Sequence, residues 1–376
     1  MLDYEDLAKI RDDLNRSKSK SQASRTISIA RSMLNWAYAE HASRTGLAKL
    51  QFVFWGRWKI ARKSGVRDHA PTISELARTL VLVEHLHSLS QQSHSAGAVD
   101  ASMVGALWAL VLTGQRVGQL LRTPTGRLLE SPKVPVGWRV LTWKPEEVKK
   151  VEGLSLPHWL PVPPETIAIL GYWRSRRDGD RSDWMFPSLR GFGPVTEGGL
   201  AGLLRRLQGI RHRTKPSGRG TIDARRIRGK ARTGLSKSQG VDLFAGHGIQ
   251  PWIPHDVRRA IVTFLGDHGL GGSASAIIAH REYREDLKRE YERERMLPVT
   301  ELHYNRSQKL GLKVEGMKLW TKAILDAYEI EKASFTSALT RTEGAKSGIP
   351  WAAPAFEECE AVMDPGSFIP STRKDV

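Results

Sequence analysis

The sequence predicts a mainly helical α/β protein that contains one small antiparallel sheet. Residues 1–66 carry apolar side chains at helical spacing, and residues 101–114 form a long apolar run that indicates a buried helix. Residues 137–144 and 156–162 are short stretches of Trp, Val and Leu between polar breaks, which is typical of strands. The chain has 376 residues, 40% of them hydrophobic, so one to three domains with sizeable cores are expected.

The charge balance indicates a polyanionic partner. Lys and Arg number 58 against 40 Asp and Glu, which gives a formal net charge of +18 at pH 7. A chain this basic is most simply explained by binding to DNA or RNA.

Two further features narrow the class of protein. Cys359 is the single cysteine, which excludes an intramolecular disulfide scaffold and a cysteine-rich zinc module. The longest apolar stretch, residues 101–114, is too short to span a bilayer, and the acidic, amphipathic start of the chain is unlike a signal peptide. We therefore expect a cytoplasmic, nucleoid-associated protein with no membrane partner.

The first helical segment, residues 1–66, has an apolar stripe next to basic side chains. The basic residues form either a solvated face of a small bundle or a face that binds a nucleic-acid backbone. A polar break at 64–72 ends the segment and suggests a domain boundary. The stripe consists of Ile27, Ala30, Leu34 and Ala37, and it is widened by Ile29, Met33 and Trp36.

The next element begins with a recognisable helix start. Thr72 opens the sequence T-I-S-E, in which Glu75 completes a capping box, so a helix should run from there to about residue 89. Polar residues at 88–97 predict a loop before the buried helix at 101–114.

The second half of the chain alternates structured and highly charged segments. Residues 163–176 return to a helical pattern. Residues 205–240 are a basic segment interleaved with Gly, Ser and Pro, which predicts a flexible segment that only phosphate contacts would order. Residues 281–295 alternate positive and negative charges, which is typical of an exposed helix. The composition of residues 333–376 predicts a poorly ordered tail.

Four short motifs with chemically active side chains follow one another along the chain. Arg116 follows a glycine break in LTGQRVGQLL, so it starts a helix and can point into a cleft. His255 and Arg258 in PHDVRRA have the spacing that places both on one helix face, although H-x-x-R alone is common by chance. His280 ends IIAH, and Tyr304 stands in HYNRS ahead of a helical segment with a tryptophan.

This ordered set resembles the tyrosine recombinase (phage integrase) family, in particular the prophage-type integrases. The resemblance covers about residues 70–330 and extends more faintly over the start of the chain. It implies a partial helical core-binding domain at 1–66 that binds DNA. It also implies a catalytic domain at 67–332, with a basic insertion at about 205–240 and a charged helical insertion at about 281–295.

The resemblance also implies a reaction. Tyr304 would attack a DNA phosphodiester and keep its energy in a 3′-phosphotyrosyl bond, which requires no metal and no other cofactor. Arg116 and Arg258 would bind the non-bridging phosphate oxygens, since a guanidinium offers a planar fork of donors. His255 would accept the tyrosine proton, and His280 would donate a hydrogen bond to the same phosphate.

The family also uses a lysine in a β-hairpin to protonate the leaving 5′-oxygen. Lys149 fits that position best, with Lys150 and Lys144 as rivals. The H-x-x-P sequence from His158 to Pro161 resembles the returning strand of this hairpin.

The sequence departs from the family pattern at several positions. Gln119 stands where the first motif usually has an acid, and His280 lacks the usual preceding glycine. Tyr304 follows His280 by 24 residues, a longer gap than usual, so Tyr283 and Tyr291 are rival nucleophiles by spacing. The motif around Tyr304 and the tryptophan helix after it favour Tyr304.

Recombination implies a homotetramer on DNA, with an accessory DNA-bending protein as a further partner. The segment 313–331 is either exchanged between subunits, as in the family, or packed on its own domain; its apolar stripe comprises Leu319, Trp320, Ile324, Leu325 and Tyr328. Two other functions stay open: a non-catalytic DNA-binding protein derived from an integrase, and a type IB topoisomerase-like enzyme.

Overall fold

The computed structural model divides the chain into two compact units, Met1–Asp68 and His69–Val376. This division lies close to the polar break at 64–72. Each unit is described by itself. The structure describes residues 4–17, 19–50, 53–58, 69–93, 99–148, 157–177, 182–189, 193–210, 241–279 and 309–343.

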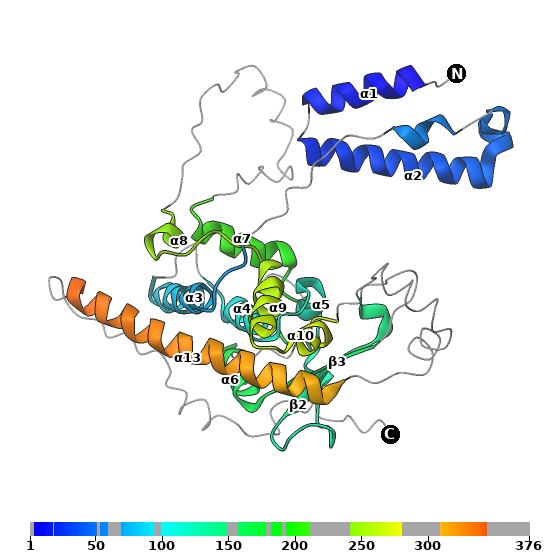
Figure 1. Ribbon diagram of the computed structural model, residues 1–376. Coiled ribbons are helices and arrows are strands. Elements are labelled where there is room, and N and C mark those ends of the chain that lie inside the picture. The colour runs from blue at the N-terminus through cyan, green and yellow to red at the C-terminus, as the bar shows by residue number, and fades with distance from the viewer. Residues whose placement is uncertain are drawn as a thin grey trace, which may run out of the picture. The chain divides into compact units, whose positions relative to one another are not determined.

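The first unit consists of two long helices and two short 3-10 helices. Helix α1 (Tyr4–Ser17) packs along α2 (Lys20–Thr45), and η1 (Leu47–Lys49) and η2 (Phe54–Arg57) follow (Figure 1). The hydroxyl of Ser19 caps α2 by accepting a hydrogen bond from the backbone N–H of Gln22. A small core of Leu7, Ile27, Trp55 and Trp58 holds these elements together.

One part of the sequence prediction for this unit is wrong. Ile27 is buried and Ala30 and Leu34 pack against the core, as expected. Ile29, Met33 and Trp36 are instead exposed. They lie on the opposite side of α2 because their positions are about half a helical turn away from the buried stripe.

The second unit is mainly helical and contains a three-stranded antiparallel sheet. Strand β2 (Arg139–Trp143) pairs with β3 (His158–Val162), with Leu141 opposite Leu160. Both strands lie within the segments that the sequence predicts. Strand β1 (Leu128–Leu129) pairs with the other edge of β2 and is too short to give a periodic signal.

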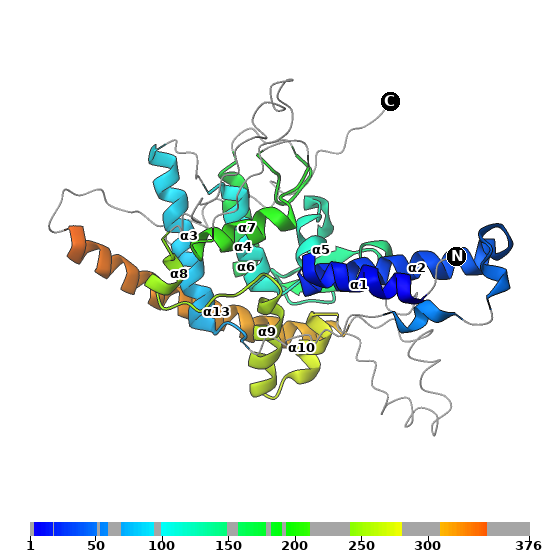
Figure 2. The ribbon, with the colours of Figure 1, turned by 90° about the horizontal axis from the view of Figure 1, so that it is seen from above.

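The helices of this unit surround one nearly continuous core. Helix α4 (Ala101–Thr113) lies at its centre, buried along its length as predicted, and α6 and α13 pack against it (Figures 1 and 2). The other elements are α3 (Ile73–Ser93), α5 (Val117–Leu121), η3 (Thr125–Arg127), η4 (Pro145–Glu147), α6 (Pro164–Ser175), α7 (Glu197–Leu207), α8 (Leu243–Gly246), α9 (Asp256–Asp267), α10 (Gly271–Ile277) and α13 (Leu310–Glu343).

Helix α13 packs on its own unit. It runs along α3 and also contacts α10, α4 and β3 (Figure 1). Trp320, Ile324 and Tyr328 are buried, and the indole N–H of Trp320 donates to the carbonyl of Val111 in α4 at 2.9 Å. Of the two alternatives for the apolar stripe, the structure shows packing on its own domain.

Other segment boundaries differ from prediction. Helix α3 continues to Ser93, into the expected loop at 88–97, and α13 continues to Glu343, beyond the expected start of the tail at 333. Helix α7 was not predicted, and it takes up the first residues of the basic segment 205–240. Residues 211–240 and the charged segment 281–295 lie outside the described residues.

Glycine allows one close helix contact in this unit. A Cβ added to Gly316 of α13 would lie 2.8 Å from Ile277 and 2.9 Å from Ser273, both in α10. The two helices therefore approach more closely than a larger residue would allow. Within the described ranges, no helix is long and apolar enough to cross a membrane.

Candidate anion-binding site

Arg116 is placed by a glycine turn between α4 and α5. Gly114 ends α4 with φ of 60°, in the left-handed region, and a Cβ there would lie 3.1 Å from Ile261 of α9. Arg116 then forms the N-terminal boundary of α5, as the glycine break predicts. Its side chain is half-buried, and among the described residues no hydrogen bond or ion pair holds its guanidinium. Burial lowers the pKa of Arg116.

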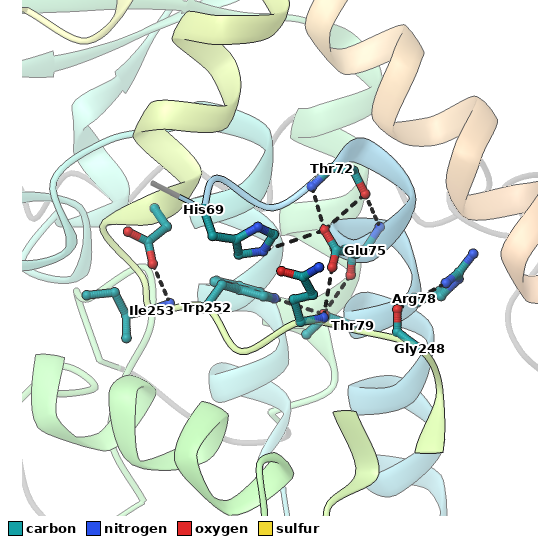
Figure 3. Close-up of polar contacts among 10 residues, drawn as sticks. His69, Thr72, Glu75, Arg78, Thr79, Gly248, Trp252 and Ile253 are labelled. Carbon is teal, nitrogen blue, oxygen red and sulfur yellow. Dashed lines mark hydrogen bonds and ion pairs between the residues drawn. The ribbon is translucent and has the colours of Figure 1, made fainter. Parts of the chain in front are cut away.

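A second helix start is held by buried polar contacts (Figure 3). The predicted capping box is confirmed: Glu75 accepts from the backbone N–H of Thr72 at 2.8 Å, and Thr72 Oγ1 accepts from that of Glu75 at 3.2 Å. The other oxygen of Glu75 accepts from the backbone N–H of Gln250 at 2.8 Å. One buried carboxylate thus fixes both the start of α3 and the segment that leads to α9.

The last residues before α9 are tied in the same way. The indole N–H of Trp252 donates to Thr79 Oγ1 at 3.3 Å, and the backbone N–H of Ile253 donates to Asp256 Oδ2 at 2.9 Å (Figure 3). These contacts fix the start of α9, where His255 is the N-cap residue and Arg258 lies about one turn further along the helix.

Arg258 connects two turns of the chain. Its side chain is only 6% exposed. Nη1 donates to the carbonyl of Gly114 at 2.9 Å, and Nη2 donates to that of Ile278 at 2.5 Å. A guanidinium has five N–H donors, so these two bonds leave others for a ligand. Burial and the neighbouring Arg116 lower the pKa of Arg258 to about 10.

His255 lies at the rim of this group and is solvent-accessible. Partial burial is the main cause that lowers its pKa, and Arg258 adds to the effect, while Asp256 opposes it. The imidazole is therefore neutral at pH 7, the form that can accept a proton.

The structure adds two basic residues that the sequence did not single out for the site. His158 of β3 is 3% exposed, and its ring stacks on Trp143 with centroids 5.4 Å apart. Lys313, in the first turn of α13, is also 3% exposed. Its Nζ donates to the carbonyl of Trp159 at 2.6 Å and lies 3.5 Å from His158 Nδ1.

Burial is the main cause of the pKa shifts of Lys313 and His158. It lowers the pKa of Lys313 to about 7, with a smaller effect from Lys309. It also lowers the pKa of His158 well below its usual value, and Lys313, Arg258 and Arg116 add to that shift by repulsion. The pKa of His158 is thus lowered by Lys313 and by both arginines, so His158 lies near all three of them.

One signal for Lys313 is present in the sequence. It stands four residues before Met317, in line with the buried side chains of Trp320 and Ile324. A lysine within such a stripe is buried when the helix packs, and a buried amine is a candidate functional group. His158 gives a weaker signal, since a histidine within a short strand is often structural.

Basic side chains gather in this site, and no acid in the described part of the chain is paired with them. Four segments contribute Arg116, His158, Arg258 and Lys313, and no acidic side chain in the described part of the chain forms an ion pair with any of them. Bringing cations together in a half-buried place is unfavourable unless an anion joins them. The arrangement therefore suits a phosphate or a similar oxyanion.

Three of the predicted site residues, Lys149, His280 and Tyr304, lie outside the described residues, as do the rivals Lys150, Tyr283 and Tyr291. The structure brings together the other three, Arg116, His255 and Arg258. The rival Lys144 is exposed at the end of β2, and its backbone N–H donates to Glu147 at 2.6 Å.

Two of the departures from the family pattern have structural counterparts. Gln119 lies in α5, and its Nε2 is buried without a hydrogen-bond partner among the described residues. Ala279, directly before His280, has φ of 48°, a conformation that favours glycine.

Comparison with known proteins gives no match: no family model, no curated protein and no solved structure is significantly similar to this chain.

Proposed function

We propose that the chain is a site-specific DNA recombinase of the tyrosine type, similar to prophage integrases, which cleaves and rejoins duplex DNA through a 3′-phosphotyrosyl intermediate. One observation carries the proposal. Arg116 and Arg258, 142 residues apart in the sequence, lie close enough to lower the pKa of Arg258, with His255 beside them and no acid paired to either in the described part of the chain.

The arginines are suited to a phosphodiester in its transition state. Attack on phosphorus concentrates negative charge on the non-bridging oxygens. Fixed guanidinium donors therefore stabilise the transition state more than they stabilise the ground state. Loss of one such donor typically costs about 3 kcal/mol of barrier, a hundredfold or more in rate. Arg258 is already held in place by Gly114 and Ile278, so little reorganisation is needed when DNA binds.

The proposed proton balance involves a tyrosine, two histidines and a lysine. The Tyr304 hydroxyl loses its proton to neutral His255 as its oxygen bonds to phosphorus. The bond from phosphorus to the 5′-oxygen breaks, and that oxygen takes a proton from Lys149, with Lys150 and Lys144 as alternatives. His280 donates a hydrogen bond to a phosphate oxygen. In the rejoining step, a free 5′-hydroxyl attacks the phosphotyrosine and gives its proton back to the lysine. His255 returns its proton to the oxygen of Tyr304 as that oxygen leaves phosphorus.

The partners follow from the same reaction. Duplex DNA matches the excess of 18 positive charges. Exchange of two duplexes needs four cleaving subunits, so a homotetramer forms on DNA, helped by a DNA-bending protein. Because the apolar stripe of α13 is buried in its own unit, the contacts between subunits involve other surfaces.

The test is covalent capture on DNA. A library of nicked duplexes, designed so that the cleaved end diffuses away, is incubated with the full chain, and protein–DNA adducts are separated on denaturing gels. Wild type should form adducts, and Tyr304→Phe, which removes only the hydroxyl, should form none. Tyr283→Phe and Tyr291→Phe are the matched controls and should form them.

Each other outcome has a defined meaning. Adducts that persist in Tyr304→Phe but vanish in one of the control variants move the nucleophile to that tyrosine. Specific binding of wild type without any adduct supports the non-catalytic DNA-binding alternative. Relaxation of supercoiled DNA at any sequence, without joining of two sites, supports the topoisomerase alternative.

A further inference from the structure

Lys313 is a buried lysine beside His158, and His158 in turn lies near Arg258 and Arg116. Its amine donates to the carbonyl of Trp159 and lies 3.5 Å from Nδ1 of His158, and both Lys313 and His158 are 3% exposed. Nε2 of His158 is also buried and makes no hydrogen bond of normal length among the described residues, although the backbone of Ile277 is near. A buried amine is charged only where a negative charge compensates it.

The elements around Lys313 supply no such negative charge in the described part of the chain. The titratable groups beside Lys313 are both basic: His158 on β3, at 3.5 Å, and Lys309 at the start of α13. Arg258 on α9 and Arg116 before α5, which are basic too, lie near His158. The residues of α10 that are buried beside α13 are Ser273, Ala274 and Ile277, none of which ionises.

The acids on or near α13 are placed elsewhere. Glu315 is exposed, two residues along the helix and on a different face. Glu84 contacts the helix at Tyr328, and Glu331 is paired with Arg78, so both lie at least 15 residues, or about 22 Å, from Lys313.

We propose that Lys313 is a positioning residue of the anion site, and that it takes up a proton when an oxyanion binds between Arg116 and Arg258. The inference rests on the proposed function, which places the DNA phosphate between these arginines. His158, which feels both Lys313 and the arginines, connects the two places. The bound anion supplies the negative charge that the buried amine lacks, so proton uptake and anion binding strengthen each other.

The sign of the resulting pH dependence follows from this linkage. Anion affinity is highest where Lys313 is already protonated, below pH 7. It falls as the pH rises above 7, by up to tenfold per pH unit, because each binding event must then also capture a proton. His255 does not contribute in this range, because its pKa lies below the usual value of 6.5.

The experiment uses the full chain with sulfate as the probe, because sulfate does not titrate near neutral pH. Sulfate affinity is measured by thermal stabilisation at constant ionic strength between pH 6.5 and 8.5, for wild type, Lys313→Met and Lys318→Met. Lys318 is an exposed lysine on the same helix and controls for the removal of one positive charge. Wild type and Lys318→Met should lose affinity above pH 7, and Lys313→Met should show a flat profile.

A profile in Lys313→Met as steep as in wild type would overturn the proposal, and so would a flat profile in wild type. If Lys313→Met fails to fold, a second experiment on wild type tests the proposal. Calorimetry of sulfate binding at pH 7.5, in two buffers with different ionisation heats, gives the number of protons taken up on binding. It should detect uptake of a substantial fraction of a proton, and no uptake would refute the proposal.

These results are independent of DNA cleavage. A pH profile that depends on Lys313, together with no covalent adduct on DNA, would leave the anion site and its proton in place and refute the recombinase function. Adduct formation combined with an unchanged profile in Lys313→Met would refute only the role of Lys313.

Discussion

Glu84 should make the stability of the second unit depend on pH. This carboxyl of α3 is 6% exposed, and it accepts hydrogen bonds from the indole of Trp108 at 2.7 Å and from the hydroxyl of Tyr328. Burial raises the pKa of Glu84 from 4.5 to about 7, although the two hydrogen bonds and Lys332 oppose the rise. The folded protein therefore holds a proton on Glu84 that the unfolded chain has already released above pH 4.5.

The size of the effect follows from that shift. A difference of about 2.5 pH units, at 1.36 kcal/mol each, amounts to about 3 kcal/mol. This contribution to the free energy of unfolding is fully present below pH 4.5. It decreases as the pH rises and is absent above pH 7, because the folded state then has to bury a charged carboxylate or distort.

Replacement of Glu84 by Gln tests this directly, because the amide keeps the shape of the protonated acid and does not titrate. Urea unfolding of wild type and Glu84→Gln, followed by tryptophan fluorescence from pH 4.5 to 8, gives the difference in the free energy of unfolding. The variant should gain about 3 kcal/mol relative to wild type over this range. Glu329→Gln, at an exposed neighbouring acid on α13, should show no comparable gain.

A difference between wild type and Glu84→Gln that stays constant with pH would refute the reasoning. A difference that changes in the opposite direction would show that Glu84 is charged in the folded state.

Three further predictions concern the site and its surroundings. Arg258→Lys cannot reach the carbonyls of both Gly114 and Ile278, so we expect a decrease of about 2 kcal/mol in the free energy of unfolding, measured by urea denaturation, and no DNA adducts. Ala279→Gly removes the strain of a left-handed alanine, and it should raise stability by up to about 1 kcal/mol in the same assay. Deletion of residues 211–232 removes many basic side chains, so the slope of log K against log salt for duplex DNA should become shallower by about 0.9 for each phosphate that is no longer neutralised, with site preference kept.

Local sequence patterns predicted the elements whose signal is contained in a few neighbouring residues. The apolar run at 101–114, the capping box from Thr72 to Glu75 and the two strand segments correspond to α4, the start of α3, β2 and β3. The glycine break likewise placed Arg116 at a helix start. In each case the signal lies within one short segment of the chain.

Patterns that depend on tertiary packing could not be predicted in this way. His158 and Lys313 are 155 residues apart, and only the packing of α13 beside β3 brings them together. The stripe of α13 has the same periodicity whether it covers its own core or a neighbour's. Ile29 and Met33 of α2 are exposed although they are apolar. Because α2 has apolar residues on several sides, its sequence alone does not show which side is buried.

The close approach at Gly316 has a mechanical consequence. Any larger residue at position 316 would push α13 away from Ile277 and Ser273 of α10. Ile278 directly follows α10, and its carbonyl accepts a hydrogen bond from Arg258, so such a displacement would reach the edge of the anion site. The spacing of two helices and the placement of an arginine outside both of them therefore depend on the same glycine.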